Sequence, residues 1–523
     1  MKYIFITGGV VSGLGKGILA ANIGRLLQKQ GWKVNALKCD PYFLESPASL
    51  DPNEHGEVFV LDDGTMCDLD LGHYKRFIPD LITDYRSSQT SGKIYKKVID
   101  DSAHGKHQGR TTQLVPHVSN EIIERFQAFD TGDTENEFTI IEIGGTVGDM
   151  ESDIYIESIK QFKRTHKNSI SIHLGLLPFI EQSGELKTKA LQHSVGALQS
   201  RGAAPDILVC RNKYGISEDE RDKLSLFCNI DKNCIIDDKD CSVYDLCNDL
   251  YEQGLVGTIY DLLDIDKHVK RIDYKINFPL NVEPGYMIAP KKVAIVGACM
   301  KNIDAYKSII ESLKLQQLVT GIPVEPTIVN ASLLNDGNCR VILNDYKAII
   351  VPGGYGDGEL EGKISALKYA FSHNVPCLGI ELGFQAMCIE AIRSCSFVGF
   401  HEEFEPGHNI PDYAIKEKDI RLGSKSINIK TESRLYNVYK TNKIDRICNY
   451  KYEFNNNFKD LAEGALLNLT ASYDEDGTLM ACEYANHIFY VGVQYRPELS
   501  STLDHPEQLF VELIKATDMK EGM

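Results

Sequence analysis

The sequence predicts an α/β fold built on a doubly wound parallel sheet, followed by a second α/β domain. Short apolar runs alternate with helical patterns through the first half of the chain, which is typical of a parallel sheet with helices on both faces. The first apolar run, over residues 3–6, leads into a glycine-rich loop and then a helical pattern over 18–30. The same alternation starts again at residue 292.

The bulk composition indicates a multidomain protein of the cytoplasm. The chain has 523 residues, enough for two or more domains. Its formal net charge of -18 argues against a nucleic-acid partner. We expect no membrane span and no signal peptide, because no apolar run is long enough and the N-terminus enters a strand directly. The 14 cysteines form no C-x-x-C pairs, which favours reduced thiols over zinc ligands or disulfides.

The loop after the first strand has the composition of a phosphate-binding loop. Residues 8–17 read GGVVSGLGKG. Glycines let backbone N–H groups close around phosphate oxygens, and the N-terminus of the following helix adds positive potential. Lys16 would reach the terminal phosphates, but Gly17 stands where a Ser or Thr usually binds Mg²⁺. The metal ligands must therefore come from elsewhere, and an ordinary glycine-rich turn remains the alternative.

Charged side chains follow the next strands at their carboxyl ends. The strand over 33–37 leads to Lys38 and Asp40, and the strand over 138–143 contains Glu142 near its end. Open α/β sheets place their ligands at this edge. Asp68 and Asp70 precede a helix, where they would either hold a metal or cap the helix.

Cations and an amide gather later in the first half. They are Lys187, Lys189, Gln192, Arg211 and Lys223. In an acidic protein, cations near strand ends fit a second phosphate-bearing substrate. The alternative for each lysine taken singly is a solvated charged face.

The second half starts after a polar, proline-bearing stretch, which predicts an interdomain linker. We expect a first domain over 1–265, a linker over 266–290 and a second domain over 291–523. In the second domain, a strand over 346–351 precedes a Pro-Gly-Gly turn, and a strand over 375–380 precedes Glu381. A further strand over 490–494 precedes Arg496 and Glu498.

These motifs together resemble the CTP synthase family over essentially the whole chain. The matching segments occur in the family's order and spacing, at residues 7–18, 38–42, 55–60, 68–78, 142–152 and 187–192. The resemblance implies a P-loop-like amidoligase domain and a class I glutamine amidotransferase-like domain. In that family, ATP phosphorylates the uracil 4-oxygen of UTP, and ammonia then displaces the phosphate. This order of steps makes chemical sense, because the uracil carbonyl oxygen is a poor leaving group and phosphate is a good one.

The resemblance also implies roles for individual residues, with ATP and Mg²⁺ as cofactors and a homotetramer that shares the UTP pocket between subunits. Lys16 and Lys38 would be catalytic, and Asp70 and Glu142 would bind the metal. The residues implied in ATP binding are Ser12, Gly13, Leu14, Gly15, Lys16, Gly17, Ile18 and Asp70. Those implied in UTP or CTP binding are Ser12, Asp149, Glu151, Lys187, Lys189, Gln192 and Lys223.

The glutaminase positions depart from the family pattern. The family places a nucleophilic cysteine on a sharp strand-to-helix turn, where this chain has Glu381. The family's histidine–proline–glutamate run reads Arg496-Pro497-Glu498 here. A carboxylate forms no thioester, and arginine accepts no proton near neutral pH. We expect Glu381 and Arg496 to form a salt bridge in a degenerate pocket.

Other departures concern the nitrogen source. Residues 44–50 and 103–109 differ from the segments that lie near the family's ammonia route, and residues 449–452 differ from its glutamine-binding run. The leading hypothesis is an ATP-dependent C–N ligase that aminates UTP at C4 with free ammonia and has no functional glutaminase. One alternative is a ligase that joins another small amine to the same position. The other is a non-catalytic regulatory partner of a true CTP synthase.

Overall fold

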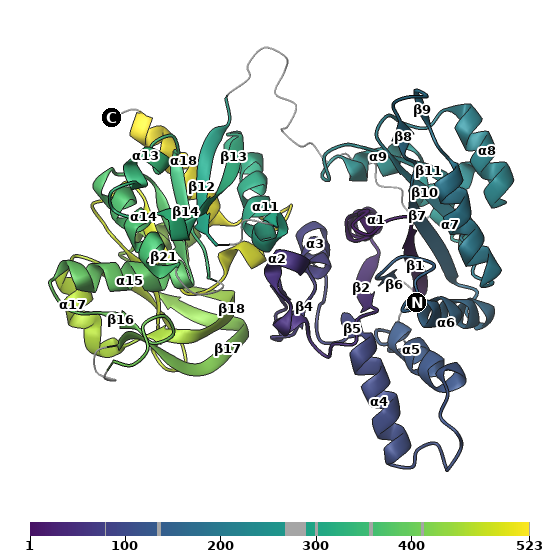
Figure 1. Cartoon of the computed structure of the whole chain (residues 1–523), viewed down its shortest axis with the longest axis horizontal. Helices are drawn as coiled ribbons and strands as arrows, with labels where there is room; N and C mark the ends of the chain where they lie inside the picture. The colour runs from purple at the N-terminus through teal and green to yellow at the C-terminus, as the bar shows by residue number, and fades with distance from the viewer. Residues whose placement is uncertain are drawn as a thin grey trace. The chain divides into compact units, whose positions relative to one another are not determined.

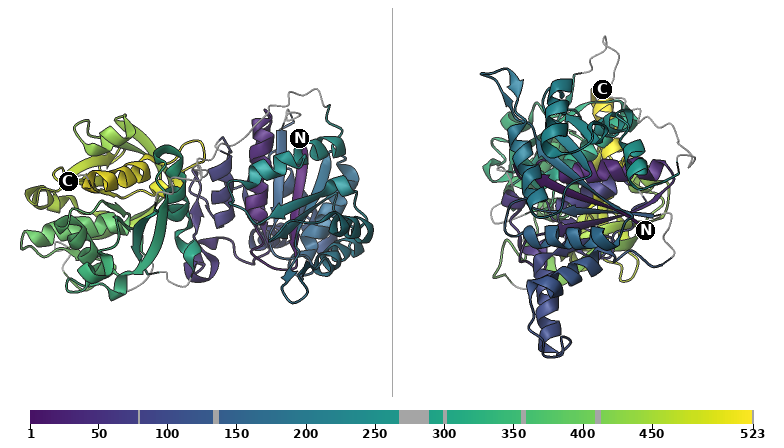
Figure 2. Two further views of the ribbon diagram at one scale, coloured as in Figure 1. Left: turned by 90° about the horizontal axis from the view of Figure 1, so that it is seen from above. Right: turned by 90° about the vertical axis from the view of Figure 1, so that its right-hand side faces the viewer.

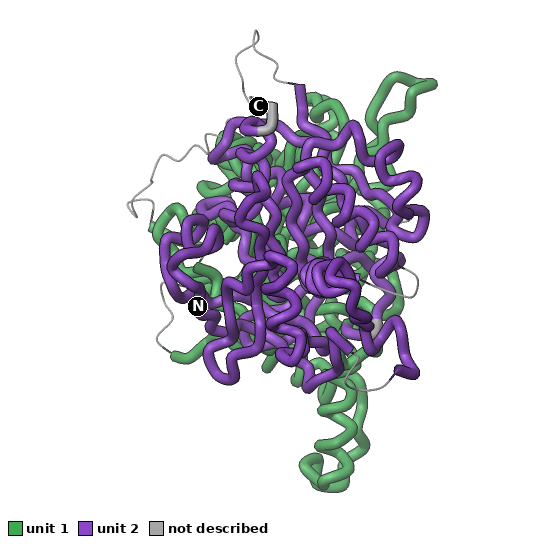
Figure 3. Tube along the Cα trace, turned by 90° about the vertical axis from the view of Figure 1, so that its left-hand side faces the viewer, with its two compact units in different colours: residues 1–47, 70–278 green, residues 48–69, 279–523 purple. Residues whose placement is uncertain are grey.

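A computed structural model gives the fold of residues 1–78, 80–132, 137–266, 289–298, 302–354, 359–408 and 413–521. The chain forms two compact units (Figure 3). The first contains residues 1–47 and 70–278, and the second contains 48–69 and 279–523. Most of the predicted linker, residues 267–288, lies outside the described residues.

The first unit is built on a seven-stranded sheet in which every pairing is parallel (Figure 1). This confirms the predicted doubly wound architecture, and the strands predicted over 33–37 and 138–143 are β2 and β6. In sheet order the strands are β11 (Ile235–Lys239), β10 (Ile207–Asn212), β7 (Ser169–Leu176), β1 (Lys2–Gly9), β6 (Glu137–Ile143), β2 (Lys33–Asp40) and β5 (Ser88–Thr90).

Helices cover both faces of this sheet, as can be followed in Figure 2. Apolar side chains of β1, β2 and β6 pack against α4, α5 and α6 on one face, and α7 and α8 continue that layer over β10. The buried face of α1 packs on the other side. The helices are α1 (Lys16–Lys29), α3 (Leu69–Phe77), α4 (Ser91–Ala103), α5 (Ser119–Phe126), α6 (Asp153–Thr165), α7 (Lys189–Ser200), α8 (Glu218–Cys228), α9 (Leu246–Glu252) and α10 (Leu255–Leu262).

The second unit contains a ten-stranded mixed sheet. The five strands from β13 to β21 pair in parallel, and the following strands are mostly antiparallel. In sheet order they are β13 (Val324–Asn330), β12 (Lys291–Gly297), β14 (Ala348–Val351), β15 (Cys377–Ile380), β21 (Tyr490–Val493), β20 (Leu479–Glu483), β19 (Asn468–Tyr473), β17 (Tyr413–Ile429) and β16 (Phe400–His401), with β18 (Lys443–Phe454) paired to β17.

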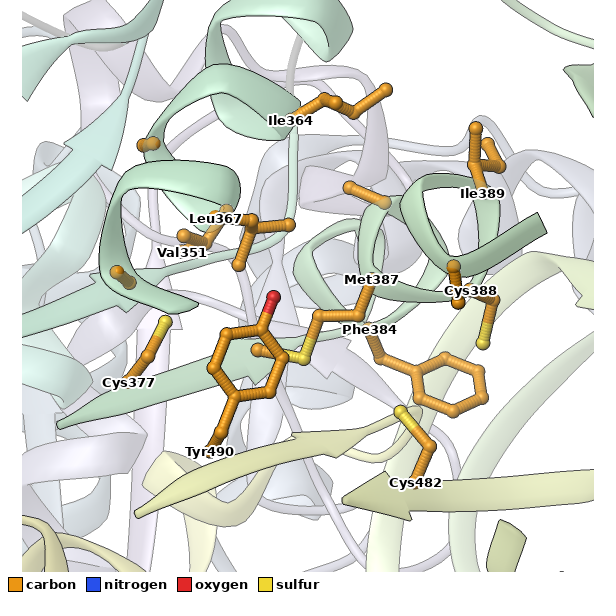
Figure 4. Close-up of a cluster of buried hydrophobic side chains, with 14 of the residues drawn as sticks. Val351, Ile364, Leu367, Cys377, Phe384, Met387, Cys388, Ile389, Cys482 and Tyr490 are labelled. Carbon is orange, nitrogen blue, oxygen red and sulfur yellow. The ribbon is translucent and has the colours of Figure 1, made fainter. Parts of the chain in front are cut away.

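The core of the second unit fixes the turn between β15 and α15. Figure 4 shows Phe384 and Met387 of α15 packed with Cys482 of β20 and Tyr490 of β21. Because these side chains are fully buried, the start of α15 has little freedom to shift. The helices of this unit are α2 (Pro52–His55), α11 (Lys307–Leu315), α12 (Gln317–Thr320), α13 (Cys339–Leu343), α14 (Leu360–Ser372), α15 (Leu382–Ser394), α16 (Arg434–Tyr439), α17 (Lys459–Gly464) and α18 (Gln508–Glu521).

An early segment of the chain, residues 48–69, belongs to the second unit. It contains α2 and a small hairpin of β3 (Phe59–Val60) and β4 (Met66–Cys67). Two backbone hydrogen bonds connect this segment to the rest of the second unit. The Ser424 N–H donates to the carbonyl of Asp62, in the hairpin loop, at 2.8 Å, and the Glu57 N–H donates to the Asp304 carbonyl at 3.0 Å. The compact units therefore divide the chain differently from the predicted boundaries at this one place.

Within the described ranges, no helix combines the length and apolar character needed to cross a membrane.

Candidate functional site

The loop between β1 and α1 contains several residues with positive φ angles. Gly13 and Gly15 have φ values of 68° and 102°, in the region that favours glycine. Val10 also has a positive φ, 82°, which is unusual for a β-branched residue and marks local strain of the kind found at functional sites. The loop ends at Gly15, directly before α1, so the free N–H groups of the first helical turn face the loop.

Lys16 connects this loop to the turn that follows β6. Its Nζ donates to the Gly145 carbonyl at 2.8 Å. Burial lowers the pKa of Lys16, the nearby Glu142 carboxylate opposes that shift, and the neighbouring Lys38 adds to it. The loop lysine is therefore held over the carboxyl end of β6.

Lys38, Asp70 and Glu142 form one buried cluster. The Lys38 Nζ donates to Glu142 Oε1 at 2.7 Å and to the Asp70 carboxylate, and it lies 3.7 Å from Asp40 Oδ1. The Tyr74 hydroxyl donates to the other oxygen of Glu142. The sequence predicted the first three residues as a catalytic and metal site, and the fold brings them together.

The charges in this cluster depend on one another. Burial alone would lower the pKa of Lys38, but the Asp70 and Glu142 carboxylates outweigh it and raise that pKa well above its usual value. Burial raises the pKa of Glu142, and the Asp70 charge adds to this effect. Burial alone would raise the pKa of Asp70, but the charges of Lys38 and His73 outweigh burial and lower that pKa.

The structure gives a steric reason for glycine at position 17, which the sequence alone did not reveal. A Cβ at this position would lie 2.1 Å from Asp70 Oδ1. The Asp70 carboxylate thus takes the space that a serine or threonine side chain would occupy in the usual loop. Oxygen ligands of this kind suit Mg²⁺, which is commonly held by one or two carboxylates together with substrate phosphates. The residues present therefore fit the implied metal.

A cavity of about 450 Å³ adjoins the loop, and sequence reasoning missed it. Its walls include Gly13 and Ile18 near the loop, with Leu177 and Phe179 after β7. Arg211 also lines it but is paired with Asp238 at 2.8 Å and Asp240 at 2.9 Å. The phosphate-binding role expected of Arg211 stays a prediction, and the structure adds that two carboxylates accompany its guanidinium. The available signal was the parallel topology, which carries β10 and β11 to the same edge as the loop.

The residues predicted to bind UTP are spread along α7 and its surroundings. Lys189 and Gln192 lie in the first turns of α7, and Lys223 lies on α8. Lys187 precedes α7 and is paired with Glu185. Glu151 instead lines a hollow of about 770 Å³ with Ser200 and Arg201, at the other end of α7. Asp149 is exposed in the turn before α6, and Ser12 is exposed in the loop.

The second unit contains the sharp strand-to-helix turn that the sequence predicted at Glu381. This residue has φ 53° and ψ −105°, a strained combination for a side-chain-bearing residue. Its N–H donates to the Val493 carbonyl at 2.8 Å. A Cβ on the flanking Gly383 would lie 1.9 Å from the Val351 carbonyl oxygen, so the tight turn needs glycine there.

The Glu381 carboxylate occupies the space beside the Pro-Gly-Gly turn. A Cβ on Gly353 would lie 2.7 Å from Glu381 Oε2. Burial raises the pKa of Glu381, whereas Arg496 and the backbone N–H groups of Leu382 and Gly354 act to lower it. Those N–H groups are the donors that this kind of turn offers to an oxyanion. Lys363 fixes the turn, because its Nζ donates to the Pro352 carbonyl at 3.1 Å and pairs with Glu359 at 2.9 Å.

The prediction that Arg496 forms a salt bridge with Glu381 is wrong, because Arg496 pairs with other carboxylates. Among the described residues, the ion pairs of Arg496 are with Glu498, through Nε, and with Glu57 at 3.5 Å. Glu57 and Glu498 are both buried. The reason is that the segment 48–69 brings a carboxylate to Arg496 from far away in the sequence, while Glu381 turns to the backbone.

Two cysteines lie close in sequence to Glu381. Cys377 lies in β15 and Cys388 in α15, and burial raises the pKa of both thiols well above the usual range. Buried, protonated thiols are poor nucleophiles. Lys451, in the run 449–452 of β18, is exposed and paired with Glu417.

Comparison with known proteins assigns both halves of the chain. The family model described as CTP synthase N-terminus matches residues 2–265, and the model described as glutamine amidotransferase class-I matches residues 301–516. A protein named CTP synthase from Clostridium beijerinckii is 39% identical over 538 residues, covering 98% of each chain. Another from Roseobacter denitrificans is 40% identical over 543 residues, again covering 98% of each.

A third relative named CTP synthase, from Bacillus anthracis, is 38% identical over 533 residues and covers 99% of this chain and 98% of its own. These matches extend over both units, so the similarity is not confined to a shared nucleotide-binding domain. The chain therefore belongs to the CTP synthase family of ATP-dependent C–N ligases.

Proposed function

We propose that this protein aminates UTP at C4 with free ammonia and does not use glutamine. The observation that carries the proposal is the position of Glu381. It stands on the strained turn where the family has its nucleophile, and its carboxylate lies against the Pro-Gly-Gly turn, where a Cβ on Gly353 would be 2.7 Å from Oε2. A carboxylate there offers no thiolate to attack glutamine, and it fills the space meant for an oxyanion.

The base that should activate such a nucleophile is also missing. Arg496 stays protonated at all relevant pH values and cannot accept a proton. Its guanidinium is engaged by Glu57 and Glu498. Both chemical groups needed for glutamine hydrolysis are therefore replaced, which supports an external nitrogen source.

The phosphorylation half of the reaction is supported by the cluster in the first unit. We infer that Lys16 and Lys38 stabilise the charge that develops on the phosphoryl group during transfer to the uracil 4-oxygen. Asp70 and Glu142 would hold Mg²⁺, which neutralises phosphate charge when bound. Ammonia would then attack C4 and displace phosphate. A purely regulatory protein has no need of this cluster, which argues against the alternative of a non-catalytic partner.

We infer that ATP lies with its phosphates on the loop over residues 12–18 and its base in the adjoining cavity. The cavity has a volume of about 450 Å³ and is lined largely by apolar side chains with a few polar groups. This combination is typical of pockets that bind a purine base.

Self-association would complete the UTP site. Glu151 lines a hollow at one end of α7, while Lys189 and Gln192 lie at the other, about 17 Å away along a 12-residue helix. Large apolar side chains surround the hollow, and Phe43 and Met150 are 70% and 81% exposed. An apolar patch of this kind commonly marks a protein–protein interface. We propose a homotetramer, working in the reducing cytoplasm, in which two copies jointly bind UTP.

The test compares nitrogen sources. The purified protein is incubated with ATP, Mg²⁺ and UTP, together with ammonium chloride, glutamine or a panel of small primary amines. ADP is measured by a coupled assay, and nucleotide products are identified by mass spectrometry. We expect CTP with ammonium and no product with glutamine. Glutamate release from glutamine would overturn the proposal, and a mass shifted by an alkyl group would favour the second candidate, a ligase for another amine.

A double revertant sharpens this test. Glu381→Cys with Arg496→His restores the two catalytic residue types of the family. We still expect no glutamine hydrolysis, because the run 449–452 no longer carries the family's glutamine-binding residues. One control is ammonium-dependent CTP formation by the same variant, which should persist and show that the first unit is folded. Urea denaturation checks the second unit, because Arg496→His removes a guanidinium paired with Glu57 and Glu498.

A further inference from the structure

Three buried side chains form a hydrogen-bonded line across the face of the first sheet that α7 covers. His173, in β7, has its Nδ1 2.9 Å from Thr7 Oγ1 of β1 and its Nε2 2.9 Å from Ser194 Oγ of α7. The imidazole has no exposed surface, and both hydroxyl-bearing residues are buried. The line therefore links the strand that enters the phosphate loop to the helix that covers it.

The imidazole in this line is neutral. Burial and the nearby Lys16 charge lower the pKa of His173 to about 3. A neutral imidazole has one N–H donor and one acceptor nitrogen. One hydroxyl must then accept a hydrogen bond from the ring while the other donates one to it, so the two hydrogen bonds depend on each other.

The same line touches the start of the phosphate loop. A Cβ on Gly9 would lie 1.6 Å from Ser194 Oγ and 3.0 Å from His173 Nε2. Gly9 is the last residue of β1. The absence of a side chain there lets α7 approach the backbone of the loop directly, so a shift of either element would break this contact.

We propose that His173 is a positioning residue that holds α7 in register with the phosphate loop and thereby sets the spacing of the two nucleotides. This inference rests on the proposed function, because the first turns of α7 carry Lys189 and Gln192, which we assign to UTP. His173 is fully buried, so its imidazole offers no surface to a nucleotide. It acts through Thr7 on the loop side and through Ser194 on the helix side.

The role differs from that of an ordinary core histidine in one measurable way. A residue that only stabilises the fold changes the amount of folded protein, and the KM for UTP of the remaining enzyme stays constant. A positioning residue changes the KM for UTP while the first unit remains folded. Loss of one buried hydrogen bond of this kind corresponds to roughly a 3- to 10-fold effect.

The experiment uses isosteric changes in the full-length protein. Thr7→Val and Ser194→Ala each remove one hydroxyl from the line. We expect each to raise the KM for UTP roughly 3- to 10-fold, with the KM for ATP changed less than twofold, in the ammonium-dependent reaction. Loss of either hydrogen bond already uncouples α7 from β1. The KM for UTP of the double variant should therefore be no higher than that of the more impaired single variant. Additive effects, or an unchanged KM for UTP, would overturn the inference.

Two matched variants serve as controls. Thr7→Ser keeps the hydroxyl, so this variant should have the same KM for UTP as the wild-type protein. Ser158→Ala removes a fully buried serine of α6 whose Oγ donates to the Ile154 carbonyl at 2.7 Å. It should lower stability to a similar extent without changing the KM for UTP. An equal KM effect in Ser158→Ala would assign the whole effect to stability.

A second measurement needs no nucleotide and separates this inference from the proposed function. Amide hydrogen exchange is followed in residues 9–15 and 189–195. We expect Thr7→Val and Ser194→Ala each to raise exchange in both segments together, and Thr7→Ser in neither. Exchange that rises only in the mutated element would overturn the positioning role. Coupled exchange in a protein that does not consume UTP would uphold it and reject the proposed substrate instead.

Discussion

At the scale of single residues, the first unit depends on the way Lys38 is shared between two carboxylates. Its ammonium group bonds to Asp70 and Glu142 while burial disfavours all three charges. Such a cluster is maintained only if the charges remain balanced. Truncating Glu142 would remove the acceptor of the Tyr74 hydroxyl and one of the two carboxylates bonded to Lys38. A neutral isostere at Glu142 is therefore the informative change.

We expect Glu142→Gln to reduce ADP formation by roughly a hundredfold or more, because it removes a metal-binding charge next to the transferred phosphoryl group. The fold should persist, since the amide can still bond to Lys38 and Tyr74. Activity and Mn²⁺ binding measured by paramagnetic resonance test this. Glu137→Gln, at the start of the same strand and bonded to Asn35 at 3.1 Å, is the control. Near-normal turnover by Glu142→Gln would refute the metal assignment.

His401 gives the second unit a defined response to pH. It is buried, with Nε2 2.9 Å from Gln385 Oε1, and burial lowers its pKa to about 3. The unfolded chain binds a proton near pH 6.5, so stability is full above that value and is lost as the pH falls toward 3.

We therefore expect wild-type protein to lose roughly 2 kcal/mol more than His401→Gln between pH 7 and pH 5. Urea denaturation followed by fluorescence at several pH values measures the difference. The variant is less stable at pH 7, so the prediction concerns the slope alone. Parallel curves for the two proteins would mean that His401 already titrates normally in the folded state.

At the scale of elements, the turn between β15 and α15 was predictable while the environment of Arg496 was not. The spacing of Gly379, Glu381 and Gly383 signals a sharp turn through local sterics. The partner of Arg496, Glu57, lies 439 positions away in a segment that the order of motifs places in the first domain. No local pattern encodes that contact.

Arg496→Met should destabilise the second unit by roughly 3–5 kcal/mol, because it leaves the buried Glu57 and Glu498 without their counter-charge. Glu57→Gln should cost less, since Arg496 keeps Glu498. Both variants are compared by urea denaturation and by amide exchange over residues 52–60. Lys443→Met, which breaks an exposed pair with Asp474, is the control and should cost about 0–1 kcal/mol. Equal costs for Arg496→Met and Lys443→Met would show that the pair is effectively solvated.

The sheets and the phosphate loop were predictable from sequence because their signals are local. Apolar runs gave β1, β2 and β6 to within a few residues, and glycine content gave the loop between β1 and α1. The cavity beside the loop was missed because its walls come from β7, β10 and β11 and from the segments that follow them. The steric reason for Gly17 likewise depends on where α3 places Asp70, which is a property of the assembled fold.

At the scale of the whole molecule, the exposed apolar hollow near Glu151 predicts assembly. Met150→Asp puts a charge at a site that is 81% exposed, so it should not disturb the fold. If two copies meet there, the variant should sediment as smaller species and show a raised KM for UTP. Met519→Asp, at a 60% exposed position of α18, is the matched control. An unchanged sedimentation profile for Met150→Asp would place the interface elsewhere.

The membership of residues 48–69 in the second unit has a consequence for dissecting this protein. The chain passes from one unit to the other at 47–48, at 69–70 and at 278–279, so a single cut cannot yield two complete halves. A fragment starting at residue 291 would lack Glu57, and with it the acceptor for the Ser308 N–H, which lies 2.9 Å away. Expressing the amidotransferase-like half on its own would therefore report on an incomplete body, and adding residues 48–69 in trans as a peptide would be needed to restore it.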